Sequence, residues 1–256
     1  MWFMKKKLTE QQAAEVNELG WTALREQDLD TALRHFKTLG KALPDDARWI
    51  NGIGAVCLAR DEEDEARLHF QMAADRDLPA GHYNLALMAY RADDHPTAVE
   101  HLQRAIRHDF PLALGLLGEI HLQAERYEEA EQAYRHAARL GHIDSYNNLG
   151  LMFLEREDYA QAKQALLQGL QSEHVYAEHN LAVACHRLGE LEAAERWYHI
   201  SFANYGNLQS LENLGYVYCQ SGRQAEGEAL VEASDKLYED TPLNDYEQSL
   251  VDRLLA

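Results

Sequence analysis

The chain has 256 residues, 46% of them hydrophobic, and its 24 basic and 43 acidic side chains give a formal net charge of −19. The apolar content excludes a wholly disordered chain, and no apolar run is long enough to cross a bilayer. The negative charge argues against a nucleic-acid binder, which needs a basic face. Three widely separated cysteines give neither a disulfide framework nor a zinc spacing.

The first twelve residues, 1–12, are predicted to be a solvated N-terminal flank. Their three consecutive lysines, Lys5 to Lys7, follow a very short apolar patch. A secretory signal has the reverse order and a longer apolar core. Together with the cysteine content, this order predicts a soluble protein of the cytoplasm, with no membrane association.

An internal repeat fills residues 13–240. In each copy a leucine or isoleucine precedes a small residue, and a second small residue follows twelve positions after the first. The seven copies are marked by Leu19, Ile53, Leu85, Leu117, Leu149, Leu181 and Leu214, at spacings of 34, 32, 32, 32, 32 and 33 residues. A spacing of about 32 residues accommodates two helices of roughly 12 residues each and two short turns.

The small residues predict how the two helices of a copy pack. They let the helix backbones approach closely, and a large residue four positions after the second one fills the space beyond. Asp28, Asp94 and Asp158 stand where they would cap the second helix, and Asp158 with Gln161 has the spacing of a capping box. A single helix pair cannot bury its apolar face alone, so the copies are expected to stack.

These residues carry a family resemblance. The most complete copy, with Leu19, Gly20, Ala32, Phe36 and Pro44, resembles the tetratricopeptide repeat. Stretches such as residues 146–153 also resemble the related Sel1-like repeat, although its glycine-rich insertion is absent. The resemblance implies an all-α fold, a right-handed α-solenoid of about seven helix-turn-helix repeats over residues 13–240.

Residues 241–256 are predicted to form a C-terminal capping helix. Thr241 supplies a cap residue, Pro242 follows it, and the apolar residues after it have helical spacing. Such a helix would cover the exposed face of the last repeat. The alternative is that it folds back into the groove as an internal blocker.

No catalytic or metal-binding signature is found in the chain. It has no phosphate-binding glycine loop, no His-Glu-x-x-His and no Gly-x-Ser-x-Gly motif. His179 and His186 would share a helix face, but no third metal ligand is in view. His121, Cys57 and Cys185 occupy a core position of their copies. The sequence therefore predicts a protein that is not an enzyme and has no catalytic residue, metal or cofactor.

The residue just before the repeat leucine suggests a binding function. It is asparagine in four copies: Asn84, Asn148, Asn180 and Asn213. In the family that the chain resembles, this position lies on the first helix of a repeat and faces the concave groove. A side-chain amide carries a donor and an acceptor and can pair with any peptide backbone. The resemblance thus implies an asparagine ladder that holds an extended peptide, while inheritance through repeat duplication is the alternative.

Further positions on the first helices are expected to line the same groove. They offer aromatic, histidine and arginine side chains, which are typical of recognition surfaces. Acidic residues instead gather on the second helices and in the turns. The additional candidates for peptide binding are Tyr83, Tyr90, Arg91, Asn147, Tyr176, His179, Arg187 and Tyr216.

The resulting hypothesis is a protein–protein interaction module, an adaptor, assembly factor or co-chaperone-like protein, with a protein or peptide partner in its concave groove. Recognition of a chaperone C-terminus is disfavoured, because Leu112 and Leu116 stand where that specialisation needs lysine and arginine. Two alternatives stay open. One is a self-associating scaffold that forms a homo-oligomer, and the other is a peptide-sensing regulator gated by the C-terminal helix.

Overall fold

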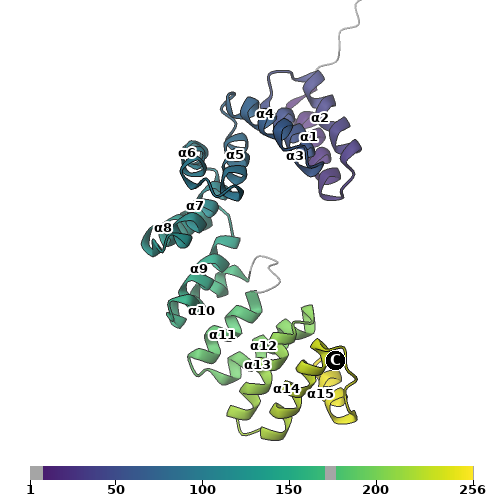
Figure 1. The fold of residues 1–256 in the computed structure, drawn as a ribbon, viewed down its shortest axis with the longest axis vertical. Helices are drawn as coiled ribbons and strands as arrows, with labels where there is room; N and C mark the ends of the chain where they lie inside the picture. Colours follow the sequence, from purple (N-terminus) through teal and green to yellow (C-terminus); the bar gives the residue numbers. More distant parts are fainter. Residues whose placement is uncertain (1–7, 171–176, 256) are drawn as a thin grey trace, which may run out of the picture. The chain divides into compact units, whose positions relative to one another are not determined.

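A computed structural model describes residues 8–170 and 177–255, and all regular structure within these ranges is α-helical (Figure 1). The all-α prediction is confirmed. The helices are α1 (Glu10–Arg25), α2 (Leu29–Ala42), α3 (Ala47–Ala59), α4 (Glu63–Ala74), α5 (Pro79–Arg91), α6 (His95–Ile106), α7 (Pro111–Gln123), α8 (Tyr127–Arg139), α9 (Asp144–Glu155), α10 (Tyr159–Gly169), α11 (Ala177–Arg187), α12 (Leu191–Tyr205), α13 (Leu208–Gln220), α14 (Gln224–Tyr238) and α15 (Asp245–Leu255).

The helices follow the predicted repeat, with each odd-numbered helix from α1 to α13 as the first helix of a copy and the next helix as its second. The chain divides into two compact units, unit 1 (Met1–Gln123) and unit 2 (Ala124–Ala256). The division falls between α7 and α8, the two helices of the fourth copy. Within each unit, the second helix of a copy also packs on the first helix of the next copy, which is the stacking of an α-solenoid.

The predicted close approach of the two helices is confirmed. At Gly20, a Cβ atom would lie 2.6 Å from the ring of Phe36, and at Gly150 it would lie 2.3 Å from Cγ of Leu166. Phe36 and Leu166 are the large residues that the repeat places four positions after its second small residue, and both are fully buried. The glycine therefore provides the space that the large side chain fills.

The turns inside the repeats share a conformation that the sequence did not reveal. The eighth residue after the repeat leucine has a positive φ in every copy, and these residues are Gln27, Asp61, Asp93, Glu125, Glu157, Gly189 and Gly222. A left-handed residue just past a helix end is a common way to terminate a helix. Only the last two copies use glycine there, so the other five turns hold a side chain in a conformation that disfavours it.

The capping predictions are confirmed for the second helices. The carboxylates of Asp28, Asp94 and Asp158 accept hydrogen bonds from the backbone N–H groups of Thr31, Thr97 and Gln161. The side chain of Gln161 donates to the Asp158 carboxylate at 2.6 Å, so this pair is joined through both side chains.

The first and the last helix begin at other residues than the sequence predicted. Helix α1 begins at Glu10, inside the predicted flank, because Thr9 and Gln12 form a capping box. Helix α15 begins at Asp245 and not near Thr241, because Asn244 accepts hydrogen bonds from the backbone of Tyr246 and Glu247. Thr241 instead hydrogen-bonds the carbonyl of Lys236 at the end of α14.

Helix α15 packs on second helices. It contacts α14 and α12, and a ring nitrogen of His199 on α12 lies 2.7 Å from the carbonyl oxygen of Leu254. The buried carboxylate of Glu247 accepts a hydrogen bond from Lys236 on α14 at 2.7 Å. No helix in the described part of the chain combines the length and the apolarity needed to span a membrane.

Candidate functional site

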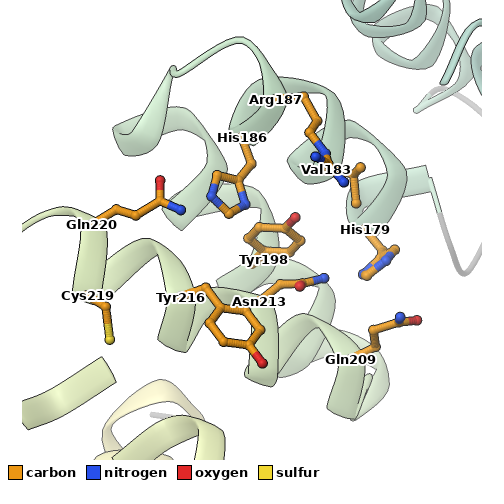
Figure 2. A pocket seen from close by; sticks show the side chains of 10 residues that line it. All are labelled: His179, Val183, His186, Arg187, Tyr198, Gln209, Asn213, Tyr216, Cys219 and Gln220. Atoms are coloured by element: carbon orange, nitrogen blue, oxygen red, sulfur yellow. The ribbon is translucent and has the colours of Figure 1, made fainter. Parts of the chain in front are cut away.

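The candidate site is a cavity of about 720 Å³ between α11 and α13, the first helices of the last two copies, in unit 2 (Figure 2). Figure 2 shows Tyr198, from the second helix α12, between the side chains of α11 and those of α13. The lining residues are His179, Val183, His186, Arg187, Tyr198, Gln209, Asn213, Tyr216, Cys219 and Gln220. The cavity is therefore a groove whose sides are first helices.

Matching positions of the two copies form the two sides of the groove. Val183 and Tyr216 are each the second residue after the repeat leucine, and Arg187 and Gln220 are each the sixth. Positions four residues apart lie on one face of a helix, so these side chains follow one another along each wall. The groove is a consequence of stacking two copies of the same pattern.

Tyr198 forms the floor of the groove. Only 1% of its surface is exposed, and burial raises the pKa of its hydroxyl above the usual tyrosine value. The rings of His179 and His186 lie 5.7 and 6.1 Å from the Tyr198 ring, centroid to centroid, in tilted and edge-on arrangements. Such contacts hold the Tyr198 ring at the base of the groove.

His179 is held in a buried hydrogen-bond chain. Its Nδ1 lies 2.7 Å from the Ser210 hydroxyl, which in turn donates to the Ser201 hydroxyl at 2.9 Å. In this chain Nδ1 of His179 carries the proton, and Nε2 of the neutral ring is left as an acceptor. Burial lowers the pKa of His179, which keeps the ring neutral at neutral pH.

The remaining polar groups are available to a ligand. Asn213 is half-buried and Arg187 is exposed, and neither side chain makes a hydrogen bond or ion pair with another residue in the described ranges. Tyr216 is 44% exposed, and its hydroxyl donates to Glu212 at 2.9 Å, which raises the pKa of Tyr216. The groove thus presents an amide, a guanidinium and an aromatic ring.

The structure brings four of the predicted residues together in this groove: His179, Arg187, Asn213 and Tyr216. Asn148 on α9 and Asn180 on α11 are half-buried and do not line the cavity. Asn147 is buried, and its side-chain oxygen lies against Gly169, so its amide packs between helices and is not offered to a partner as the sequence suggested. Tyr176 lies outside the described residues.

The predicted residues of unit 1 have internal contacts. The amide of Asn84 donates to the side-chain oxygen of Asn51 at 2.8 Å. The ring of Tyr83 packs on Phe110 with a centroid distance of 5.6 Å. Tyr90 donates to Glu119 at 2.7 Å, and burial together with this hydrogen bond raises the pKa of Tyr90 to about 12. These contacts occupy groups that the sequence had assigned to a ligand.

Arg91 lies at a different place in unit 1. It lines a smaller cavity of about 280 Å³ together with Glu63 and Arg67 of the second helix α4. Arg91 holds the same repeat position as Arg187, and the sequence had placed both on the groove face. The end of a first helix therefore borders different surroundings in different copies.

Sequence reasoning did not assign six residues to the groove, namely Val183, His186, Tyr198, Gln209, Cys219 and Gln220. Gln220 could have been found, because it holds the repeat position of Arg187. Metal binding has no support in the described ranges, where no three histidine, cysteine or acidic side chains gather around a common point.

Comparisons with known proteins agree with this architecture. Family models described as tetratricopeptide repeat match residues 17–81 and 83–142, residues 143–173, and residues 175–199. These matches cover most of the chain. A comparison of the sequence with functionally characterised proteins finds no significant match.

Several solved structures share the fold. A chain in the crystal structure of the APC/C hetero-tetramer Cut9–Hcn1 matches with a TM-score of 0.60 and 17% sequence identity. The match covers 95% of the present chain but only 53% of the Cut9–Hcn1 chain, about half of its length. Pseudomonas aeruginosa PilF matches with a TM-score of 0.61 and 14% identity, over 76% of this chain and 92% of that one. PilW, a type IV pilus biogenesis factor, has a TM-score of 0.61 and 14% identity, over 80% and 99% of the two chains.

Proposed function

The chain belongs to the tetratricopeptide repeat family, and on this premise we propose that it is a non-enzymatic interaction module that holds an extended segment of a partner protein along the first helices of unit 2. The repeats and the structural neighbours support a role in protein–protein interaction or assembly. These neighbours are a chain of the APC/C hetero-tetramer Cut9–Hcn1, PilF, and the type IV pilus biogenesis factor PilW, and their partners are not carried over to this chain.

The observation that carries the proposal is the groove between α11 and α13 with its uncommitted polar groups. An extended peptide exposes one backbone donor and one acceptor per residue, and a side-chain amide such as that of Asn213 can satisfy both. Arg187 and Tyr216 line the same groove as this amide and would contact the partner's side chains. The amide would then give affinity without sequence preference, and the other two residues would give selectivity.

The second part of the proposal is an asparagine ladder that continues from the groove to the first helix α9. Asn148, Asn180 and Asn213 hold the same repeat position on three consecutive first helices of unit 2, and all three are half-buried. The side chains of Asn148 and Asn180 make no hydrogen bond with any residue in the ranges described. Their amides are thus uncommitted, which is what capture of a peptide backbone requires.

Selection of random linear peptides on the full chain tests the proposal. We expect the selected peptides to bind the Asn148→Ala/Asn180→Ala variant at least tenfold more weakly, because two backbone-binding amides are lost. The matched control is Gln164→Ala/Gln168→Ala, which removes two exposed amides from the second helix α10 of the same unit. Equal binding by the wild type and the asparagine variant would overturn the ladder, and circular dichroism checks that each variant is folded.

The alternative of a gate formed by the C-terminal helix has no support in the contacts of α15. That helix packs on α14 and α12 and contributes no residue to the groove. Binding of the selected peptides with and without residues 241–256 tests it, since a gate predicts tighter binding after truncation. Self-association stays a prediction that light scattering at several protein concentrations tests.

A further inference from the structure

A second cavity of about 720 Å³ lies in unit 1, apart from every residue of the proposed ladder. It is formed where α4 turns into α5 and where α6 ends. Its polar lining consists of Asp75, Asp77, His82, Arg104, Arg107 and His108. Two guanidinium groups and two imidazoles on one cavity are unusual in a chain with a net charge of −19, and they indicate a site for an anion.

The acidic groups at this cavity already have partners. The carboxylate of Asp75 accepts a hydrogen bond from Gln71 at 2.7 Å on its own helix. Asp77 is largely exposed and lies 3.3 Å from Nε2 of His108. Neither carboxylate forms an ion pair with Arg104 or Arg107 in the ranges that the structure describes.

Only one of the two arginines at the cavity forms an ion pair within the described ranges. Arg104 makes an exposed ion pair with Glu100, four residues earlier on α6, at 2.9 Å. Exposed pairs of this kind contribute little energy and exchange readily for a better partner. Arg107 is exposed and forms no ion pair with any residue in the ranges that the structure describes. Its positive charge is thus uncompensated at the rim of the cavity.

A buried histidine pair supplies an oriented donor. His82 is only 5% exposed, and its Nδ1 lies 3.2 Å from Nδ1 of His101 on α6. One of these two nitrogens must donate and the other must accept. When His101 donates, the neutral His82 ring carries its proton on Nε2, which is the nitrogen left free for a ligand in the cavity that this ring lines.

We propose that this cavity binds a phosphate group, held by the guanidiniums of Arg104 and Arg107 and by the imidazole of His82. The forked N–H donors of arginine match the geometry of phosphate oxygens. A phosphate also has one or two more acceptor oxygens than a carboxylate, so it can accept from donors on α5 and on α6 at the same time. The cavity is much larger than one phosphate ion, so the group fits equally on a phosphorylated side chain. The shared chemistry is the phosphate, and the probes below separate the two sources.

Titration calorimetry and histidine-ring NMR on the full chain test the proposal with two probes, inorganic phosphate and N-acetyl-O-phosphoserine amide. We expect saturable binding of at least one probe, with shifts of the His82 ring signals, and no binding of N-acetylserine amide. Tighter binding of the phosphoserine probe identifies a phosphorylated side chain as the ligand, and tighter binding of inorganic phosphate identifies the free ion. The absence of saturable binding for both probes would overturn the proposal.

A matched pair of variants separates a built site from general charge attraction. Arg107→Gln removes the uncompensated charge and should weaken binding roughly tenfold or more. Arg34→Gln makes the same change at an exposed arginine on the second helix α2 of unit 1 and should leave the affinity within about twofold. Equal weakening by both variants would show that the anion only senses the net charge.

The pH dependence gives a readout that does not depend on these variants. The groups that face His82 are His101, Arg104, Asp77 and His108, and its pKa is lowered by burial and then by the charges of His101 and Arg104. A bound anion favours the protonated ring, so binding of sulfate, whose own charge is constant in this range, should tighten as the pH falls from about 8 to about 6. If the affinity for sulfate does not change over this pH range, His82 does not contact the bound anion.

Discussion

The side-chain amide of Asn84 on α5 donates to the side-chain oxygen of Asn51 on α3 across 2.8 Å, and so joins the first helices of two neighbouring copies. Asn51 is 3% exposed, so this hydrogen bond satisfies a buried acceptor. Asn84 shares its repeat position with Asn148, Asn180 and Asn213, which have no such partner among the described residues. One position of the repeat therefore serves packing in unit 1 and remains uncommitted in unit 2.

Removal of the Asn84 amide should destabilise the fold. Asn84→Ala leaves the buried oxygen of Asn51 without its donor, which costs about 1–2 kcal/mol. Asn180→Ala is the matched control and should change the stability by less than about 0.5 kcal/mol, because no internal hydrogen bond is lost. Thermal unfolding followed by circular dichroism measures both, and equal effects would contradict the distinction between the two units.

The contact between Gly150 and Leu166 should reverse the usual effect of replacing glycine by alanine. In an exposed helix this change stabilises by about 1 kcal/mol. Here the added Cβ would meet Leu166 Cγ at 2.3 Å, so Gly150→Ala should destabilise by about 1–3 kcal/mol through overpacking. In a Leu166→Ala background the clash is absent and the same change should become neutral or stabilising. Additive effects of the two changes in a double-mutant cycle would contradict this packing.

The left-handed turn residues can be tested with opposite substitutions in neighbouring copies. Glu157 has a φ of 59°, so Glu157→Gly relieves backbone strain and should stabilise the fold by up to about 1 kcal/mol. Gly189 has a φ of 77°, so Gly189→Ala should destabilise the fold by about 1 kcal/mol. A Cβ at Gly189 meets no atom within 4 Å, so this effect comes from backbone strain alone. Gln164→Gly, inside α10, is the control and should destabilise by about 1 kcal/mol. If both glycine substitutions destabilise equally in urea unfolding, the turn is not strained.

Five buried or half-buried histidines predict a loss of stability in mild acid. Burial lowers the pKa of His69, His82, His101, His142 and His179 in the folded chain. In the unfolded chain these histidines become protonated near pH 6.5, whereas in the folded chain they become protonated only at lower pH. Unfolding is therefore accompanied by proton uptake, and the free energy of unfolding falls as the pH drops through about 6.5. Melting temperatures from about pH 8 to about pH 5, at high salt to screen the repulsion of an acidic chain, measure this loss. A constant or rising melting temperature would contradict it.

Much of the fold could be predicted from the sequence, because its signals are local. The spacing of the repeat, the small residues and the capping aspartates each act within about 32 residues, and the helix pairs and the caps at Asp28, Asp94 and Asp158 are as predicted. The start of α15 was missed, because Asn244 and Glu247 form a stronger N-terminal cap than Thr241. The left-handed turn residues were missed, because five of the seven are not glycine.

The candidate site could be predicted only in part. The sequence by itself determined that the chain is an array of helix pairs, since apolar and small residues at helical spacing leave no other way to bury one face of each helix. It also determined which positions stand on first helices. Whether a polar side chain at such a position is open to a partner depends on what packs against it. Asn51 of the preceding copy accepts from Asn84, and Gly169 on the second helix of the same copy lies against Asn147, whereas the side chain of Asn213 lines the same cavity as Arg187. Only the tertiary structure decided this, because exposure is a property of packed neighbours and not of a residue's place in a repeat.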